Sequence, residues 1–247
     1  MAQRSVPKPR AAAAGGRSRL PLVFGVVAAA VVVAVAVVLV AVLAAGTKSA
    51  STSPTTTSAR QAASLFAGIP QRGYELGASS APNTLLVFED PQCPYCRQWN
   101  EQALPAVLTD YVRTGRLKLD YRGVEVIGPN SLLGLRANYA AGEQNKLWQF
   151  SQALYDRQGA ENSGWITTSV IRAAAKAAHA DAGRILKALN SPAVTQAVGQ
   201  SINEAQQIKL QGTPTFVLQK PLQNPQELQV TGLDAQSFES TLASALQ

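Results

Sequence analysis

The sequence predicts an α/β fold in which a helical block interrupts a small sheet domain, preceded by a single transmembrane helix. Residues 84–88 form a short apolar run, which is typical of a strand buried on both faces. Residues 131–210 are rich in Ala, Gln and Leu at helical spacing, and strand-like runs return after Thr213. Residues 20–45 carry no charge and are long enough to span a bilayer.

The first 64 residues divide into three segments by composition. Residues 1–19 are basic, residues 20–45 are almost entirely Val, Ala and Leu, and residues 46–64 are rich in Ser and Thr. About 20 apolar residues span the hydrocarbon core of a membrane, and basic flanks stay on the cytoplasmic side. We therefore expect a cytoplasmic tail, a single-pass anchor and a flexible linker that hold an extracytoplasmic domain at residues 65–247.

A cleaved signal peptide is the alternative for the apolar segment. The apolar regions of signal peptides are about 7–15 residues long, which is shorter than this run. Small residues at Ala44 and Ala45 nevertheless permit cleavage. The protein is then either held in the cell membrane or secreted after cleavage, and both interpretations place the folded domain outside the cytoplasm.

The net charge of +7 belongs to the N-terminal segment. Seven of the 22 basic residues lie within residues 1–60, which hold no acidic residue, and the other fifteen balance fifteen acidic side chains. A nucleic-acid-binding protein concentrates its positive charge on the folded part. The charge distribution therefore excludes nucleic acid as a partner.

The folded part begins near residues 65–68 with elements in the order strand, helix, strand. The apolar run at 84–88 leads into a polar turn and then into the cysteine motif. Apolar residues recur at helical spacing after the motif as far as Gly115, and we expect Pro105 to kink this helix. Residues 117–122 alternate between apolar and charged side chains, which predicts a half-exposed strand.

A helical block follows at about residues 129–210, and sheet returns after it. Residues 191–192, Ser-Pro, are typical of an N-cap and a first helical position. Residues 215–219 and 228–232 are strand-like and are joined by a short turn-rich segment, which favours antiparallel neighbours. Asp234 is expected to cap a last helix. The predicted order is βαβ, a helical block, then ββα.

Cys93 and Cys96 are the only cysteines, and they form the motif Cys93-Pro94-Tyr95-Cys96. A disulfide between residues so close in sequence closes too small a loop to stabilise a fold appreciably. Proline at the first helical position places Cys93 near the N-cap, where free N–H groups and the helix dipole favour a thiolate. We therefore predict that Cys93 exchanges with substrate sulfurs and that Cys96 resolves the mixed disulfide.

Metal binding and an inert disulfide are the alternatives for these cysteines. A structural zinc ion needs four ligands, and His179 is the only further candidate for a soft ligand. One histidine cannot complete that set, and nothing around it suggests the nucleophile of a Ser/His/Asp hydrolase. We expect no metal and no cofactor beyond the redox-active pair of cysteines, while an inert disulfide stays open as the second alternative.

Two motifs together resemble the DsbA-like branch of the thioredoxin superfamily. The first is residues 88–97, Phe-Glu-Asp-Pro-Gln-Cys-Pro-Tyr-Cys-Arg, and the second is residues 212–216, Gly-Thr-Pro-Thr-Phe. The resemblance covers about residues 69–247. It implies a thioredoxin-like fold with an inserted helical domain and a cis peptide bond before Pro214, beside the cysteines. It also implies that Thr213 offers its backbone to the substrate peptide.

Two departures from the family pattern bear on the chemistry. DsbA carries His in the dipeptide between its cysteines, where this chain has Tyr95, and Tyr95 predicts a less acidic Cys93 and a weaker oxidant. The superfamily often has a buried acid six residues before the first cysteine, where this chain has Val87. Glu89 or Asp90 is then the candidate for proton transfer, with a loop acid that caps the turn as the alternative.

The resemblance implies catalysis of disulfide formation in reduced secreted or cell-envelope proteins. A membrane reoxidase of the DsbB-like or VKOR-like kind is the implied redox partner. A disulfide reductase or isomerase of the same fold is one alternative, which Thr213 favours because isomerase branches also use Thr there. We see no dimerisation domain before the thioredoxin-like part, which argues against a dimeric isomerase. A non-catalytic thioredoxin-like binding module is the other alternative.

Overall fold

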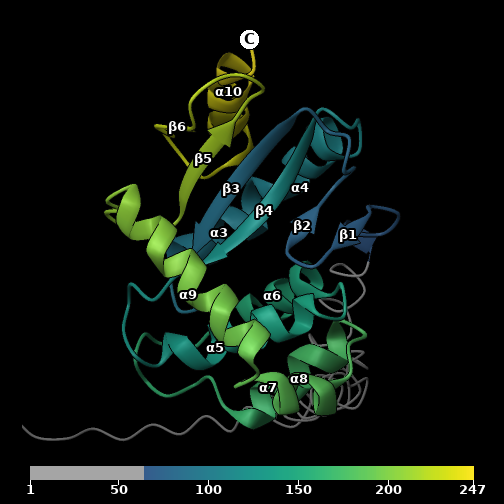
Figure 1. The fold of residues 1–247 in the computed structure, drawn as a ribbon, viewed down its shortest axis with the longest axis vertical. Coiled ribbons are helices and arrows are strands. Elements are labelled where there is room, and N and C mark those ends of the chain that lie inside the picture. The colour runs from purple at the N-terminus through teal and green to yellow at the C-terminus, as the bar shows by residue number, and fades with distance from the viewer. Residues whose placement is uncertain (1–63) are drawn as a thin grey trace, which may run out of the picture. The chain divides into compact units, whose positions relative to one another are not determined.

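The computed structural model describes residues 64–247, which form the fold drawn in colour in Figure 1. The predicted tail at residues 1–19, the predicted anchor at residues 20–45 and almost all of the predicted linker lie outside the described residues. Within residues 64–247, no helix has both the length and the apolar character that crossing a membrane requires.

A mixed sheet forms the centre of the domain. Its strand order is β1-β2-β4-β3-β5-β6, in which β3 pairs parallel with β4 and antiparallel with β5. Figure 1 shows β3 and β4 side by side, with β5 and β6 beyond β3. The strands are β1 (Gln71–Arg72), β2 (Glu75–Leu76), β3 (Asn83–Glu89), β4 (Leu117–Gly123), β5 (Thr215–Gln219) and β6 (Gln226–Glu227). The central strand β3 leads directly to the cysteine motif.

Successive residues of β3 pack into different layers. Leu85 and Val87 belong to the main core together with Trp99, which follows the cysteine motif. Leu86 joins a second cluster on the opposite face, where Ala205 of the helical block also packs. Burial on both faces explains why this run is continuously apolar, and the predicted buried strand is confirmed.

The segment after the cysteines differs from the single kinked helix that the sequence predicts. Helix α3 (Pro94–Gln102) ends at Ala103, α4 (Leu104–Val107) begins immediately after it, and a π-helical turn follows at Leu108–Val112. Pro105 lacks a backbone N–H, which is tolerated in the first turn of a helix but not in its interior. The chain therefore starts a new helix at this point, and the predicted kink is a helix boundary.

Helices fill the chain between β4 and β5. They are α5 (Ser131–Gly142), α6 (Leu147–Tyr155), α7 (Thr168–Ala177), α8 (Ala182–Ala188) and α9 (Pro192–Gln207). The Ser191 side chain accepts a hydrogen bond from Val194 N at the start of α9, so the predicted N-cap is confirmed. The helical insertion into an α/β fold is confirmed as well.

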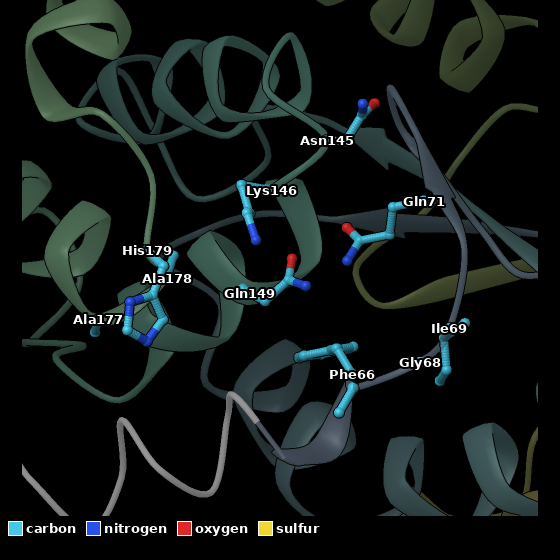
Figure 2. A pocket seen from close by; sticks show the side chains of 11 residues that line it. Phe66, Gly68, Ile69, Gln71, Asn145, Lys146, Gln149, Ala177, Ala178 and His179 are labelled. Atoms are coloured by element: carbon cyan, nitrogen blue, oxygen red, sulfur yellow. The ribbon is translucent and has the colours of Figure 1, made fainter.

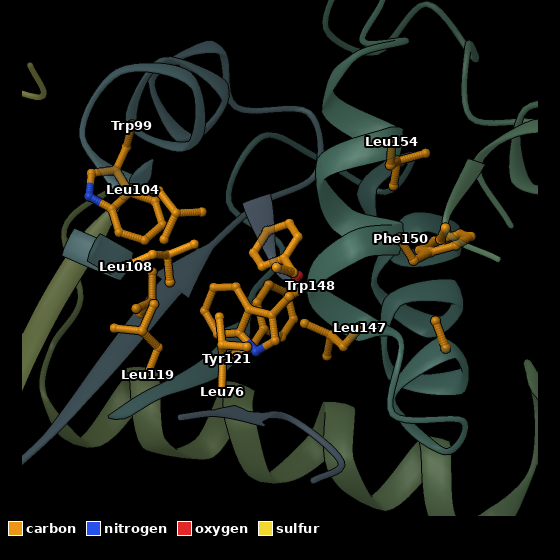
Figure 3. Packing of buried hydrophobic residues seen from close by; sticks show 14 of the residues in the cluster. Leu76, Trp99, Leu104, Leu108, Leu119, Tyr121, Leu147, Trp148, Phe150 and Leu154 are labelled. Atoms are coloured by element: carbon orange, nitrogen blue, oxygen red, sulfur yellow. The ribbon is translucent and has the colours of Figure 1, made fainter. Parts of the chain in front are cut away.

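The insertion shares its core with the sheet. Figure 3 shows Leu147 and Trp148 of α6 close to Tyr121 of β4 and Leu76 of β2. All four side chains are buried in one cluster. Trp148 Nε1 also donates a hydrogen bond to Tyr74 O at 3.0 Å. These contacts fix α6 against the sheet, and its C-terminal end then reaches the cysteine motif.

The strands at the C-terminal end differ in part from the expectation. β5 and β6 are antiparallel neighbours as predicted, but β6 covers residues 226–227 rather than 228–232. Leu228 N still donates to Phe216 O at 2.9 Å, whereas Val230 N turns back to Leu228 O at 3.1 Å. The second strand is therefore shorter because the chain leaves the ladder after Leu228.

A last helix closes one face of the sheet. Helix α10 (Ala235–Ala245) begins after Asp234, whose side chain accepts a hydrogen bond from Ser237 N, as predicted. Phe238 of α10 packs against Phe216 of β5, with the ring centroids 4.7 Å apart. This contact anchors β5, which directly follows the segment that faces the cysteines.

Candidate active site

The cysteine motif lies where β3 ends and α3 begins. Cys93 is the N-cap of α3, with φ −72° and ψ 119°, and Pro94 is the first helical residue. Cys93 N donates to Asp90 O at 3.0 Å, and Arg97 N donates to Cys93 O at 3.2 Å. The predicted N-cap position of Cys93 is therefore confirmed. Both cysteines are free thiols in this structure.

The second motif meets the first in space. The Thr213–Pro214 peptide bond is cis, as the resemblance implied. Cys93 Sγ donates a hydrogen bond to Thr213 O at 3.2 Å, although the two residues are 120 positions apart. The sulfur thus lies between the N-terminus of α3 and the backbone that precedes Pro214.

The cysteine motif is only partly exposed. Tyr95 is 62% exposed and Pro94 also lies at the surface, whereas Cys93 is 3% and Cys96 0% exposed. Tyr155 of α6 packs with both cysteines in a small cluster of its own. The dipeptide therefore forms the exposed part of the motif, with the two sulfurs beneath it.

The two thiols have opposite acid–base properties. The pKa of Cys93 is lowered to about 6, first because the Cys96 thiol donates a hydrogen bond to its sulfur. The Thr213 side chain and the backbone N–H groups of Tyr95 and Cys96 lower this pKa further, against the opposing effect of burial. The pKa of Cys96 is raised well above its ordinary value because burial disfavours its thiolate. Cys93 is therefore the thiolate and Cys96 keeps its proton.

Glu89, the last residue of β3, is fully buried beside the thiols. Asn100 Nδ2 donates to Glu89 Oε1 at 2.5 Å and to Cys96 O at 2.9 Å. Glu89 Oε2 has no hydrogen-bond partner among the described residues. Burial raises the pKa of Glu89 to about 8, and the negative charge of Cys93 adds to this rise. Glu89 therefore carries a proton at neutral pH in the immediate surroundings of the cysteines.

Asp90 is equally buried but lies in a different setting. Its Oδ1 accepts hydrogen bonds from Gln92 N and Ser131 Oγ, at 2.8 and 2.6 Å. Its Oδ2 accepts from Val126 N and Ile127 N, both at 2.8 Å. The Asp90 carboxyl thus ties together three segments around the motif. Of the two acids that the sequence offers for proton transfer, the geometry favours Glu89 and makes Asp90 the acid that holds the turn.

Sequence reasoning missed three residues of the site. Asn100 follows Cys96 by one helical turn, so their shared face of α3 was a signal that could have found it. Tyr155 OH donates to Asp90 O at 3.2 Å, and Gln158 Nε2 donates to Cys93 O at 3.0 Å. The last two residues come from the insertion, and no local pattern marks them.

A separate cavity lies at the opposite end of α6 from the cysteines. Figure 2 shows Lys146, Gln149 and His179 around it, with Phe66 at its edge, and its volume is about 340 Å³. It contains none of the predicted site residues. Within residues 64–247, no group of three or more His, Cys, Asp or Glu side chains is arranged to hold a metal ion.

The fold and the cysteine site together define a thiol–disulfide oxidoreductase. A family model described as thioredoxin matches residues 71–229, and the chain belongs to this family. It is 30% identical over 154 residues to the probable disulfide bond formation protein D of Bacillus cereus, an alignment that covers 61% of this chain and 71% of that protein.

Solved structures with the same fold include a BdbD and a DsbA protein. Oxidised BdbD from Bacillus subtilis superposes with a TM-score of 0.61 at 21% identity, covering 72% of this chain and 97% of that one. DsbA from Chlamydia trachomatis superposes with a TM-score of 0.57 at 18% identity, covering 69% of this chain and 88% of that one. The predicted resemblance to DsbA-like proteins is therefore confirmed.

Proposed function

We propose that this protein forms disulfides in reduced secreted or cell-envelope proteins, using Cys93 and Cys96 as its redox pair. One observation carries the proposal: Cys93 is the N-cap of α3, has a pKa of about 6 and lies 3.2 Å from Thr213 O. A stabilised thiolate favours the reduced form of the pair, so the disulfide form is a good oxidant of other thiols.

The reaction has two exchange steps. A client thiolate attacks Cys93 Sγ of the disulfide, the bond to Cys96 breaks, and Cys96 leaves as a thiolate. A second client thiolate then attacks the client sulfur of the mixed disulfide, which forms the client disulfide and releases Cys93 as a thiolate. The client loses two electrons and the cysteine pair gains them. A reoxidase later removes these two electrons.

Glu89 supplies the proton that Cys96 needs when it leaves. Its pKa of about 8 keeps it protonated at neutral pH, and its charge also influences the pKa of Cys96. The pKa of Cys96 is the higher of the two, so the transfer from Glu89 to the new thiolate runs downhill. Asn100 holds Glu89 in place through Oε1 and leaves Oε2 free. During reoxidation the proton returns by the same route.

Client binding involves the surface around the cysteines. Thr213 O is a backbone acceptor next to Cys93 Sγ, and a client N–H can pair with it while the mixed disulfide exists. Pro94 and Tyr95 are exposed beside it and offer an apolar contact. These contacts are made to backbone and to general apolar surface, which suits an enzyme that acts on many unfolded chains.

The location follows from the N-terminal segment and from the reaction. Disulfides persist in oxidising compartments outside the cytoplasm. The apolar segment at residues 20–45 supports either a membrane anchor or a secretion signal. An anchored enzyme would lie within reach of a DsbB-like or VKOR-like membrane reoxidase, which we propose as its electron acceptor.

The test uses full-length protein and two single-cysteine variants. We expect the wild type to accelerate disulfide formation in a reduced multi-disulfide substrate, and Cys93→Ser to abolish this activity. Cys96→Ser should trap mixed disulfides with clients through Cys93, and these adducts should disappear on reduction. If Cys93→Ser oxidises the substrate as fast as wild type, the proposed function is wrong.

A reductase of the same fold is the second candidate function, and the pKa of Cys93 is the observation that supports it. That pKa, about 6, lies between the values of about 3.5 for DsbA and about 7 for thioredoxin. Reduction potentials follow the same order, from about −120 mV for DsbA to about −270 mV for thioredoxin. A measured potential near the thioredoxin end would replace the oxidase assignment by a reductase. The intact pair of cysteines argues against a non-catalytic binding module.

A further inference from the structure

Side chains of the helical insertion hold the loop that carries Cys93. Gln158 Nε2 donates hydrogen bonds to Pro91 O and to Cys93 O, both at 3.0 Å. One turn earlier, Tyr155 OH donates to Asp90 O at 3.2 Å. Three backbone carbonyl groups of the loop therefore receive donors from one short stretch at the end of α6.

These contacts bear on the reactive sulfur through the backbone of Cys93. As the N-cap, Cys93 has dihedral angles that differ from those of the helix, and these angles decide where its side chain points. The groups that stabilise its thiolate are the Cys96 thiol and backbone N–H groups in the first turn of α3, and the Thr213 side chain just before β5. A small rotation of the Cys93 peptide plane would move the sulfur away from them.

Gln158 is placed to prevent such a rotation. It binds the carbonyl groups of Pro91 and Cys93, so the Pro91–Gln92 and Cys93–Pro94 peptide planes are both held. Its own backbone N–H donates to Tyr155 O at 3.0 Å, at the end of a helix whose start is packed against the sheet. The amide is thus attached to the sheet through α6 rather than to a freely moving loop.

We propose that Gln158 is a positioning residue for Cys93, which holds the sulfur against Thr213 and the N-terminus of α3. The helical insertion thereby takes part in setting the equilibrium between the dithiol and the disulfide. The proposal rests on the proposed function, because it assumes that Cys93 is the exchanging sulfur. Gln158 contacts none of the reacting atoms, so its effect passes through the backbone of Cys93.

A purely structural role makes a different prediction. If Gln158 only satisfies two backbone carbonyl groups, its loss lowers the stability of the domain and leaves the sulfur chemistry unchanged. If Gln158 positions Cys93, its loss also raises the pH at which the Cys93 thiolate forms. The pH at which the Cys93 thiolate forms therefore distinguishes the two roles, whereas the stability of the domain does not.

The experiment compares Gln158→Met with Gln152→Met in the full-length protein. Methionine keeps the length of the side chain and removes both N–H donors. Gln152 lies inside α6, six residues before Gln158, and is 7% exposed, but its Nε2 donates to Asp156 rather than to the cysteine loop. Thiolate absorbance against pH gives the titration midpoint of Cys93, and equilibration with glutathione at pH 7 gives the redox equilibrium.

We expect Gln158→Met to raise the titration midpoint by about one pH unit. The thiolate then stabilises the reduced form by a factor of about 2 at pH 7 instead of about 11, so the equilibrium with glutathione moves about fivefold towards the protein disulfide. Gln152→Met should leave the midpoint and the equilibrium unchanged.

The proposal is overturned if Gln158→Met lowers the stability but keeps both quantities within the error of wild type. If that variant does not fold, Gln158→Asn takes its place, because it keeps the amide and shortens the reach by one methylene group. This variant should shift the titration midpoint and the redox equilibrium in the same direction by a smaller factor. If it shifts neither quantity, the proposal is overturned. Failure of the wild type to oxidise thiols would instead overturn the proposed function.

Discussion

Glu89 and Asp90 are adjacent buried acids at the end of β3, but their surroundings differ in the number of hydrogen-bond donors. Around Glu89 the polar groups are few: one donor, Asn100, reaches it, and one carboxyl oxygen has no partner among residues 64–247. Around Asp90, one residue later, four donors reach the two carboxyl oxygens. Both acids are 0% exposed, so burial alone does not distinguish them. The number of hydrogen-bond donors distinguishes them, because Asp90 has four donors whereas Glu89 has one and keeps an oxygen that can exchange a proton.

The largest expected effect tests whether the region around Glu89 is where the chemistry occurs. Cys93→Ser replaces the sulfur that becomes the thiolate by a hydroxyl group that does not ionise near neutral pH. We expect thiol oxidation to fall by about a thousandfold or more, because no nucleophile remains. The measurement is the oxidation rate of a reduced substrate, with circular dichroism as the control for folding.

The next effect concerns the stability that Glu89 contributes as a function of pH. Its pKa is raised from 4.5 to about 8 in the folded protein, so the folded state binds a proton that the unfolded chain releases. Stability from this group is fully present below pH 4.5 and is lost as the pH rises through about 8. The Gln side chain of Glu89→Gln cannot ionise. The free energy of unfolding of this variant should therefore rise relative to that of wild type across this range, by up to about 5 kcal/mol at pH 9.

Urea unfolding of the oxidised protein at pH 5 and pH 9 measures this difference without titration of the thiols. Glu89→Gln should also slow turnover, because Gln has no proton to pass to Cys96. A stability difference that is the same at both pH values would show that Glu89 does not take up a proton on folding. The contrast with Asp90 would then disappear.

Asp90→Asn should act on stability rather than on the thiols. In wild type both Asp90 oxygens accept hydrogen bonds from N–H and O–H groups. In the variant an NH₂ group replaces one of these oxygens and cannot accept them. We expect a loss of about 2–4 kcal/mol in the free energy of unfolding at pH 7, because buried donors are left without acceptors. The titration midpoint of Cys93 should stay near that of wild type. A large shift in that midpoint would mean that Asp90 belongs functionally with Glu89.

The smallest expected effect concerns the acidity of Cys93 itself. Its rate of alkylation should reach half of its maximum near pH 6 instead of near the ordinary value of 9. Cys96→Ser replaces a thiol donor by a hydroxyl donor, so the midpoint should change by no more than about one unit. The midpoint is read from iodoacetamide rates between pH 4 and pH 9. A wild-type midpoint near 9 would show that the site does not make Cys93 more acidic than an ordinary cysteine.

The sequence was sufficient where the signal is local. The N-cap position of Cys93 follows from Pro94 at the first helical position, and Asp234 and Ser191 are caps for equally local reasons. The apolar run of β3 was recognised because burial on both faces removes polar residues from the strand. These are properties of a few adjacent residues, so the structure agrees with them.

The choice between Glu89 and Asp90 is an intermediate case. Side chains alternate along a strand, so Glu89 points to the same face of β3 as Val87, which belongs to the main core. Val87 occupies the position where the superfamily often has its buried acid. Strand parity was therefore available in the sequence and favours Glu89, although the donors that distinguish the two acids were not.

The sequence alone determined the buried strand β3, the helical insertion and the reactive pair at a helix N-terminus, because periodicity, capping and the chemistry of cysteine act over a few residues, but it missed the two-residue strands β1 and β2. Tertiary structure decided what surrounds that pair. Thr213 and Gln158 come from positions 120 and 65 residues after Cys93, respectively. Contacts between residues so far apart in the sequence depend on how the sheet and the insertion pack, and the spacing of residues along the chain does not predict that packing.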